Sequence, residues 1–276
     1  RWGRMAVVDR AYVLAEVAKY ATKAETPALS ATARAIVDSV GAQGETRRLL
    51  EVRVPDLIDY QDDSYAKRYA DVVKRVVAAE SKAAPGKTGL AEAAARYLYK
   101  FMAYKDEYEV ARLHSDPAFL AQLDAMFPNG YSVKYNLAPP TISKRDAVTG
   151  HLIKQQFGPW MRNAFGVLTR FKGLRGGSLD LFGKTDERRE ERQMIEDYIR
   201  QLDEICASLT PLNHAAAVAL ASVPDEIRGY GHVKEKSIAD AKDLRTQRES
   251  AFRNPPVAQR PAASASASAQ SERAGG

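Results

Sequence analysis

The sequence has a single cysteine, Cys206, in 276 residues, and this scarcity excludes several kinds of site. One thiol cannot form an internal disulfide, and it cannot by itself hold a zinc ion or an iron–sulfur cluster, which need several thiolates. The four histidines are scattered and lack the spacing of a metal-binding motif such as HExxH. We therefore expect a reducing compartment, the cytoplasm, and no metal site within this sequence.

Long apolar runs are also missing. No uninterrupted stretch of about 18 apolar residues, the length that crosses a membrane, occurs in the sequence. The first residues lack the order of a secretory signal, and because the chain begins at Arg1 rather than methionine we expect it to be part of something longer. The charge is a mild +6 with 41 Lys plus Arg against 35 Asp plus Glu, too dilute to predict nucleic-acid binding. We expect neither a membrane nor a nucleic-acid partner.

What is present is an ordinary globular composition, with 45% hydrophobic and 28% charged residues, enough to build a sizeable core. Residues 254–276 are rich in Pro, Ala and Ser, hold few side chains that could offset the entropy of ordering, and are predicted to be a disordered tail. Residues 1–50 are interpreted as an N-terminal helical segment and linker from a preceding domain, with Gly41 and Gly44 marking the linker. Residues 51–253 then form a helical C-terminal domain.

Apolar residues recur at helical spacing through most of the chain. The strongest pattern runs from Leu90 to Ala111, over more than about five turns. A stripe from Tyr65 to Ala79 ends before Pro85-Gly86, so these two helices should form an antiparallel pair. Asp116, Thr185 and Thr210 are predicted N-caps. Further helices are predicted over residues 7–21, 26–40, 117–126, 157–171, 186–209, 211–223 and 233–252.

The hydrophobic period changes once. Tyr131, Val133, Tyr135 and Leu137 alternate with polar residues, a pattern typical of a half-buried strand. A further apolar pair follows the turn residues near 150, which predicts a small antiparallel insert near residues 131–156. The predicted fold class is mainly α: a helical domain with a small antiparallel β insert.

Three apparent catalytic motifs fail on their geometry. Pro85-Gly86-Lys87-Thr88 contains the GKT of a phosphate-binding loop, but Ser81 stands where the first Gly is needed, and no strand precedes it. A turn between helices is the better interpretation. Gly229-Tyr230-Gly231 lacks the third Gly of a dinucleotide fingerprint. Cys206 lies on an apolar helix face and is expected to act as a small hydrophobe rather than a nucleophile.

Two charged segments remain. Between residues 134 and 175 Asp146 is the only acid, so an anion or an acidic partner could bind to this segment. The alternative is that the segment is a solvated basic face whose charge is neutralised by the acidic helix 186–197. The candidate docking residues are Lys134, Lys154, Arg162, Arg170, Lys172 and Arg175. Residues 104–112 mix both signs on an aromatic helix, which indicates buried ion pairs at a helix interface or a subunit contact.

Five strings carry a family resemblance: YLYKFMAYKDEYEVARL at 97–113, LAPP at 137–140, FGPWM at 157–161, KGLRG at 172–176 and IRGYGHVK at 227–234. With them the chain, from its first residues to about Arg253, resembles the C-terminal region of the fused indolepyruvate ferredoxin oxidoreductases, members of the 2-oxoacid:ferredoxin oxidoreductase group. The resemblance implies an enzyme that oxidatively decarboxylates aryl 2-oxoacids to acyl-coenzyme A, with ferredoxin as the electron acceptor.

The resemblance also implies where the chemistry lies. Thiamine diphosphate, magnesium and iron–sulfur clusters would be held by upstream domains of the same chain. The present sequence agrees with that division, because it has no Gly-Asp-Gly motif followed by the Asn that would hold a magnesium diphosphate, and no cysteine cluster. No catalytic or cofactor-binding residue is carried over to this sequence. The implied partners are the upstream catalytic domains, ferredoxin, and a second copy in a homo-oligomer.

The sequence thus supports three hypotheses. The first is a non-catalytic structural or docking domain of such an oxidoreductase. The second is a docking module whose basic segment receives ferredoxin or coenzyme A. The third is a free-standing helical adaptor whose likeness to the oxidoreductases is only ancestral.

Overall fold

The computed structural model describes residues 5, 7–20, 28–138, 153–229 and 232–255. Within these ranges the chain is mainly α-helical, with one two-stranded antiparallel sheet, so the predicted fold class is confirmed. The α-helices are α2 (Arg10–Tyr20), α3 (Ala31–Val40), α4 (Gly44–Tyr60), α5 (Asp63–Ala83), α6 (Gly89–Met102), α7 (Glu107–Ser115), α8 (Pro117–Met126), α9 (Met161–Leu168), α10 (Asp186–Ala207), α11 (His214–Ala221) and α12 (His232–Arg253). The strands are β1 (Tyr135–Leu137) and β2 (Gln155–Phe157), and short 3₁₀ helices are η1 (Thr169–Leu174) and η2 (Val223–Glu226).

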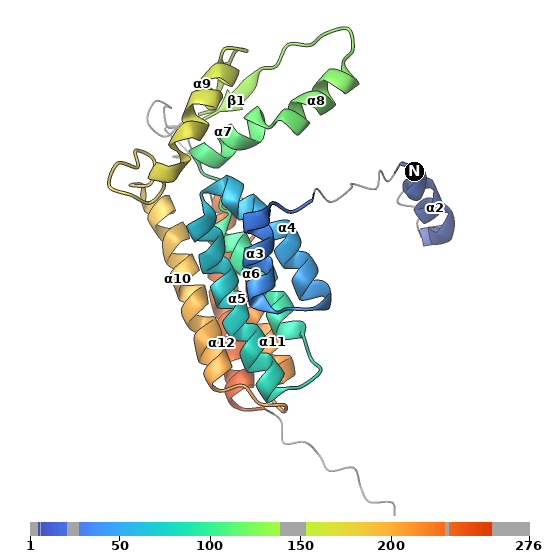
Figure 1. Cartoon of the computed structure of the whole chain (residues 1–276), viewed down its shortest axis with the longest axis vertical. Helices are drawn as coiled ribbons and strands as arrows, with labels where there is room; N and C mark the ends of the chain where they lie inside the picture. The colour runs from blue at the N-terminus through green and yellow to red at the C-terminus, as the bar shows by residue number, and fades with distance from the viewer. Residues whose placement is uncertain (1–4, 6, 21–27, 139–152, 230–231, 256–276) are drawn as a thin grey trace, which may run out of the picture.

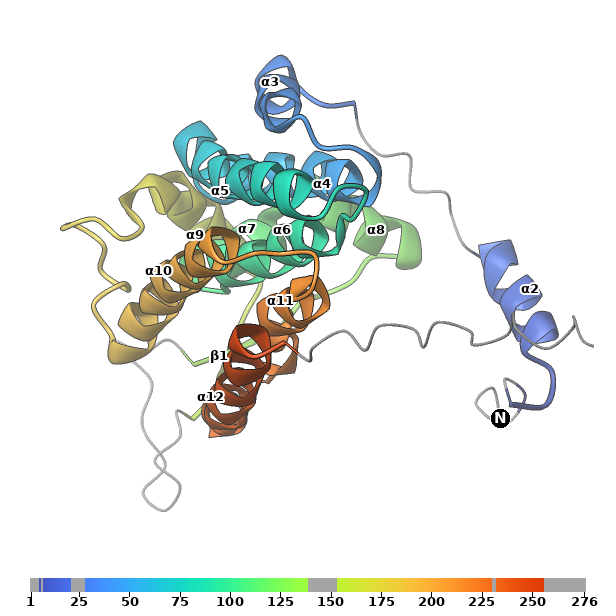
Figure 2. The same ribbon diagram turned by 90° about the horizontal axis from the view of Figure 1, so that it is seen from below.

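Seven helices form a bundle, and the segment from α7 to η1 forms a smaller lobe at one end of it (Figure 1). Viewed along the bundle, α3 covers α4 and α5, these two lie on α6 and α10, and α11 with α12 lies on the far side (Figure 2). The helices α5 and α6 pack against one another across the Pro85-Gly86 turn, as predicted for an antiparallel pair. This arrangement leaves one stripe of α6 uncovered between α4 and the η2 turn.

The main core is formed where the predicted apolar stripes meet. Tyr69 and Val76 of α5 and Leu98 of α6 are each at most 1% exposed. Because a buried Tyr needs a partner for its hydroxyl, Tyr69 donates to the carbonyl of Ala95 at 2.7 Å. Burial of each large apolar side chain contributes about 1.5–3 kcal/mol, which is why helical spacing of apolar residues predicts this core well.

The predicted domain boundary between residues 50 and 51 is wrong. Helix α4 runs through it from Gly44 to Tyr60, and Leu49 and Leu50 are buried in the same core as α5 and α6. Helix α3, which lies within the predicted 26–40 segment, also packs into this core through Val37. Gly41 ends α3 with a φ of 71°, so the glycine marks a helix C-cap inside the domain rather than a linker between domains.

The long helix predicted from Leu90 to Ala111 is two helices. Helix α6 ends at Met102, and α7 begins at Glu107 after Asp106 caps it by accepting a hydrogen bond from the N–H of Glu109 at 2.8 Å. The carbonyl of Tyr104 points out of the helical path and accepts the hydroxyl of Tyr60 at 2.9 Å. The apolar period continues across this break because both helices bury the same kind of stripe, α6 in the core of the bundle and α7 in the core of the lobe.

The lobe has its own small core of Ala111, Tyr135, Met161 and Phe165. Strands β1 and β2 pair antiparallel with Tyr135 opposite Phe157, which confirms a small antiparallel insert; both strands are shorter than the alternation suggested, and residues 139–152 lie outside the described ranges. The helix predicted over 157–171 is α9 followed by η1.

Two of the three predicted N-caps are confirmed. Asp116 accepts from Ala118 N at 2.7 Å at the start of α8, and Thr185 accepts from Arg188 N at 3.4 Å at the start of α10. The third is wrong, because α11 begins at His214 with Asn213 as its N-cap. Thr210 instead forms a local turn in which its hydroxyl accepts from Asn213 N and its own N–H donates to the Asn213 side chain.

The two ends of the chain fall largely outside this packing. The helix predicted over 7–21 is present as α2, but Leu14 and Val17 of α2 are 56% and 58% exposed. The predicted disordered tail, residues 254–276, lies outside the described ranges from residue 256 onward. The last helix, α12, extends to Arg253 and buries Phe252 in the main core.

Candidate functional site

Two of the six candidate docking cations are structural. Arg175 is buried, and its Nε and Nη2 donate to the Asp106 carboxylate at 2.5 and 2.9 Å while its guanidinium lies 3.7 Å from the centre of the Tyr60 ring. Lys172 donates to the carbonyls of Ile58 and Asp59 at the C-terminal end of α4, at 3.2 and 2.7 Å. Both side chains therefore bind η1 and the lobe to the bundle, and their donors are not available to a partner.

The other four candidates, Lys134, Lys154, Arg162 and Arg170, are exposed on the lobe. The strand register pairs Leu137 with Gln155 and Tyr135 with Phe157, so the lysines that precede β1 and β2 lie at opposite ends of the ribbon. These four cations are therefore spread over the lobe rather than grouped at one point.

The acidic helix does not neutralise these cations. Among the described residues, the ion pairs of α10 join Glu196 to Arg68 at 2.6 Å and Asp203 to Arg75 at 3.0 Å, both on α5. Glu191 of α10 is paired with Arg188 of the same helix and with Lys234 of α12. The alternative in which helix 186–197 neutralises the basic segment is therefore wrong for the four exposed cations.

The mixed-charge segment 104–112 forms buried ion pairs, as one of the two interpretations predicted. Besides Asp106 with Arg175, Glu109 pairs with Arg112 at 2.8 Å, and Arg112 also reaches Asp56 of α4 at 2.9 Å. These contacts tie the start of α7 to the bundle.

The GKT sequence is a turn between α5 and α6, as predicted. The N-terminus of α6, where a phosphate would bind in a phosphate-binding loop, already holds a carboxylate of the protein: Glu80 accepts from Leu90 N and Ala91 N at 2.8 Å each. Nε2 of His214 lies 2.5 Å from the same carboxylate, and both side chains are buried. This helix end is therefore occupied by a structural anion.

Cys206 has the environment of a small hydrophobe. Burial raises the pKa of its thiol to about 11, and the nearby Asp203 acts in the same direction. Because the nucleophile of a cysteine enzyme is the thiolate, this thiol is poorly suited to chemistry near neutral pH. The partly buried thiol packs against the main core.

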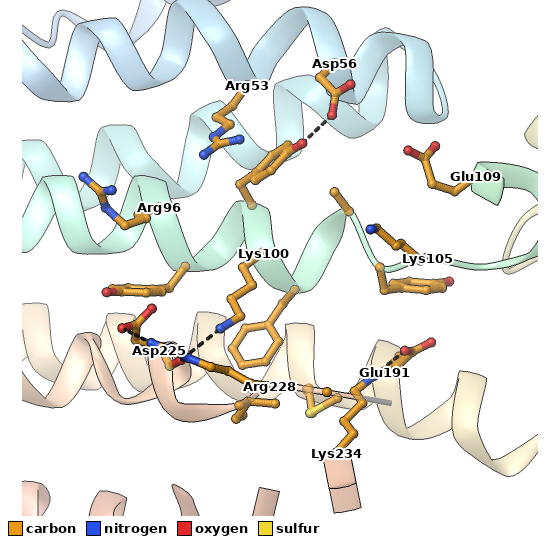
Figure 3. A pocket seen from close by; sticks show the side chains of 18 of the residues that line it. Arg53, Asp56, Arg96, Lys100, Lys105, Glu109, Glu191, Asp225, Arg228 and Lys234 are labelled. Atoms are coloured by element: carbon orange, nitrogen blue, oxygen red, sulfur yellow. Dashed lines mark hydrogen bonds and ion pairs between the residues drawn. The ribbon is translucent and has the colours of Figure 1, made fainter. Parts of the chain in front are cut away.

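A trough of about 720 Å³ lies over the uncovered stripe of α6 (Figure 3). Arg96, Tyr99, Lys100 and Ala103 recur at helical spacing and form its floor. Arg53 and Asp56 of α4 line one side, and Asp225 and Arg228 line the other (Figure 3).

Most carboxylates of the trough are already engaged. Asp56 and Glu109 share Arg112, Glu191 is held by Arg188 and Lys234, and Asp225 pairs with Arg228 at 3.0 Å. Asp56 also accepts the hydroxyl of Tyr99, and burial together with this hydrogen bond raises the pKa of Tyr99. Lys100 donates to the carbonyl of Pro224 at 2.7 Å, and its burial lowers the pKa of its ammonium group.

Among the described residues, two cations of the trough have no ion pair and a third has only a long one. No ion pair engages Arg53 or Lys105 there, and the contact of Arg96 with Glu45 is 3.5 Å long. The guanidinium carbon of Arg53 lies over the Tyr99 ring, 4.1 Å from its centre, and its Nε is shielded from water without an acceptor. Sequence reasoning missed this group, because Arg53 belongs to another helix and only the fold brings it beside α6.

Two further kinds of feature are absent from the described residues, a membrane span and a cluster of metal ligands. None of the described helices combines the length and the apolar character needed to cross a membrane. In the same ranges, no three His, Cys, Asp or Glu side chains are grouped so that they could hold a metal ion.

Comparison with known proteins adds one finding. Neither the curated proteins nor the solved structures include a match to this chain. A family model does match, over residues 46–247, which span both the bundle and the lobe. The chain therefore belongs to this family, which is described as a family of unknown function (DUF6537).

Proposed function

We propose that this chain is the non-catalytic C-terminal docking domain of an enzyme of the indolepyruvate ferredoxin oxidoreductase type, in the cytoplasm. In this proposal upstream domains hold thiamine diphosphate, magnesium and the iron–sulfur clusters and convert aryl 2-oxoacids to acyl-coenzyme A. The observation that carries the docking role is the apolar surface of the lobe.

Helix α8 is the clearest part of that surface. Its sequence is strongly apolar, yet none of its residues is buried. Phe119, Met126 and the following Phe127 are 38%, 68% and 46% exposed. On α9 and its flanks, Trp160 and Val167 are 60% and 55% exposed. Exposed apolar groups gathered on one small unit are typical of a surface that another protein or domain covers.

The state of the titratable groups supports a role without chemistry. The thiol of Cys206 has a raised pKa, and burial likewise raises the pKa of Tyr60 and Tyr69. The carboxylates of Asp106 and Glu109 are tied to arginines. A general base or nucleophile needs a pKa near the working pH, and burial moves the pKa of Cys206, Tyr60 and Tyr69 away from it.

The experiment uses the full-length enzyme. In α8, Phe119→Ser combined with Met126→Ser should impair assembly with the catalytic domains and lower ferredoxin reduction, because the apolar contact is lost. Since both side chains are exposed here, the variant of the isolated chain should keep its thermal stability. Size-exclusion chromatography and ferredoxin-reduction assays measure the two effects.

Leu212→Ser is the matched control. Leu212 is 65% exposed and lies between α10 and α11, at the opposite end of the bundle from the lobe (Figure 1). It should leave assembly and activity unchanged. If the α8 double variant assembled and turned over like the control, the lobe would not be the docking surface. Oxidation of a 2-oxoacid by the isolated chain would overturn the non-catalytic role itself.

A second candidate function, docking of ferredoxin or coenzyme A, is favoured by the four exposed cations of the lobe. Arg162→Glu with Arg170→Glu should then raise the KM for one of these partners while the KM for the 2-oxoacid stays constant. An unchanged KM for both partners would discard this function. The free-standing adaptor is separated from both by reading the codons upstream of Arg1.

A further inference from the structure

The trough over α6 carries more positive charge than its own walls neutralise. Eight of its lining residues are Lys or Arg and five are Asp or Glu. Four of these acids are held by arginines or a lysine of the trough, as described above. The surplus is concentrated in Arg53 and Lys105, which face the trough and have no ion pair among the described residues, and in Arg96, whose ion pair with Glu45 is long at 3.5 Å.

The position of the Arg53 guanidinium is fixed before any anion binds. Its guanidinium is stacked on Tyr99, and Tyr99 is fixed in turn by its hydrogen bond to Asp56. A stacked guanidinium loses little freedom when a planar or tetrahedral oxyanion binds to its free N–H groups, which is why arginine is frequent at phosphate sites. The Nε of Arg53 is shielded from water and has no acceptor in the structure, so the protein does not satisfy every donor of this guanidinium.

The trough also offers aromatic surface. Tyr97, Phe101 and Tyr104 line it together with Tyr99. Its volume of about 720 Å³ lies in the range of about 300–1,000 Å³ that small-molecule sites occupy. A ligand with a ring and an anionic group would therefore use both the stacking surface and the surplus cations.

The spacing of the cations sets the shape of the ligand. Arg96 lies six residues before Met102, the last residue of α6, and Lys105 follows beyond it. The helical rise over those six residues is about 9 Å, and Figure 3 shows the Arg96 and Lys105 side chains toward opposite ends of the trough, so a ligand that contacts both is favoured to be long.

We propose that this trough binds a nucleotide-sized phosphate ester, with its phosphates at Arg53 and neighbouring cations and its ring against the aromatic wall. The site lies mainly over the bundle, with Glu109, Arg112 and Leu113 of α7 at its edge, and it goes beyond the docking role. A protein partner is disfavoured because the trough is a single hollow among paired charges rather than a broad basic face.

The test is a calorimetric titration of the purified full chain with ADP at low ionic strength. Binding should be detectable, and Arg53→Gln and Lys105→Gln should each weaken it by at least about tenfold, the loss expected for a hydrogen bond to a charged group. Arg34→Gln, which removes the same charge from an exposed position on α3, should change the affinity by less than twofold. Adenosine, which lacks phosphate, should bind far more weakly than ADP.

Several results would overturn the proposal. These are no binding of ADP, equal binding by wild type and both trough variants, and equal binding of adenosine. A decaglutamate peptide that binds more tightly than ADP would make the trough a peptide site instead. Because Lys105 is exposed, its variant keeps the test valid even where Arg53→Gln reduces stability.

Discussion

Replacing Arg175 with methionine tests whether this arginine is structural, as the packing indicates, or a docking cation, as its sequence context suggested. The side chain is 3% exposed and binds both oxygens of Asp106. It also donates to the carbonyl of Tyr60 and stacks on the Tyr60 ring. Methionine keeps much of the length and apolar contact, but it leaves the Asp106 carboxylate buried without its cation.

The expected cost is large. Removing one partner of a buried ion pair costs about 3–5 kcal/mol, because the remaining charge is uncompensated. The free energy of unfolding of a domain is about 5–15 kcal/mol, so the Arg175→Met variant should lose a substantial fraction of it. Arg170→Met is the matched control: it comes from the same basic segment but is exposed, and its effect should stay within about 0.5 kcal/mol. Urea unfolding at pH 7, followed by circular dichroism, gives both values.

A double-mutant cycle identifies the cause. Asp106→Asn keeps an oxygen that can cap α7 but removes the negative charge. Combined with Arg175→Met it leaves no buried charge, so the double variant should lose less stability than the sum of the two single variants. If Arg175→Met cost less than about 1 kcal/mol and weakened binding to a partner instead, Arg175 would be a docking residue and the reasoning would be refuted.

Three further predictions concern buried groups. Glu80→Ala should lower the free energy of unfolding by more than about 2 kcal/mol, because Leu90 N, Ala91 N and His214 lose their partner. Glu190→Ala, at an exposed position, should not lower it, and equal urea midpoints for the two variants would contradict this. Burial acts to raise the pKa of Asp180, but hydrogen bonds from Gly176, Gly183 and Phe182 N–H groups outweigh it and lower the pKa. The stabilisation by the Asp180 carboxylate is therefore present above about pH 4 and lost as the pH falls through the lowered pKa. The difference in free energy of unfolding between wild type and Asp180→Asn should become smaller from pH 7 to pH 3, and a constant difference would contradict this. Cys206, with a pKa of about 11, should react with an aromatic disulfide reagent at pH 8 at least about a hundredfold more slowly than free cysteine, and at the free rate once unfolded; rapid reaction of the folded chain would contradict it.

The helices could be predicted from the sequence because their causes are local. Apolar residues at helical spacing form the buried stripes of α5 and α10, and the N-caps Asp116 and Thr185 act within three residues of themselves. Thr210 failed as a cap for a reason that is also local: Asn213, three residues later, offers a competing side chain at the helix start.

The break between α6 and α7 could not be predicted in this way. Asp106 and Tyr104 look compatible with a continuous helix, and the apolar period passes through them. Beside the local cap of Asp106 on Glu109 N–H, two nonlocal contacts hold the break: Tyr60, 44 residues earlier, donates to the carbonyl of Tyr104, and Arg175, 69 residues later, donates to the carboxylate of Asp106. A pattern within one segment contains no information about partners so distant.

The same limit explains why the charges of the candidate sites were harder to interpret than the helices. The basic run predicted an excess of cations in the segment 134–175, but whether a cation is free depends on which carbonyls and carboxylates the fold brings to it. Arg175 and Lys172 donate to such acceptors and hold the lobe to the bundle, while Arg53, outside any basic run, lies over an aromatic ring and has an Nε without an acceptor. A cation is therefore a good candidate for ligand binding when the fold fixes its position without satisfying its charge. In this chain Arg53 meets that condition, and the exposed lysines of the lobe, which nothing holds in place among the described residues, do not.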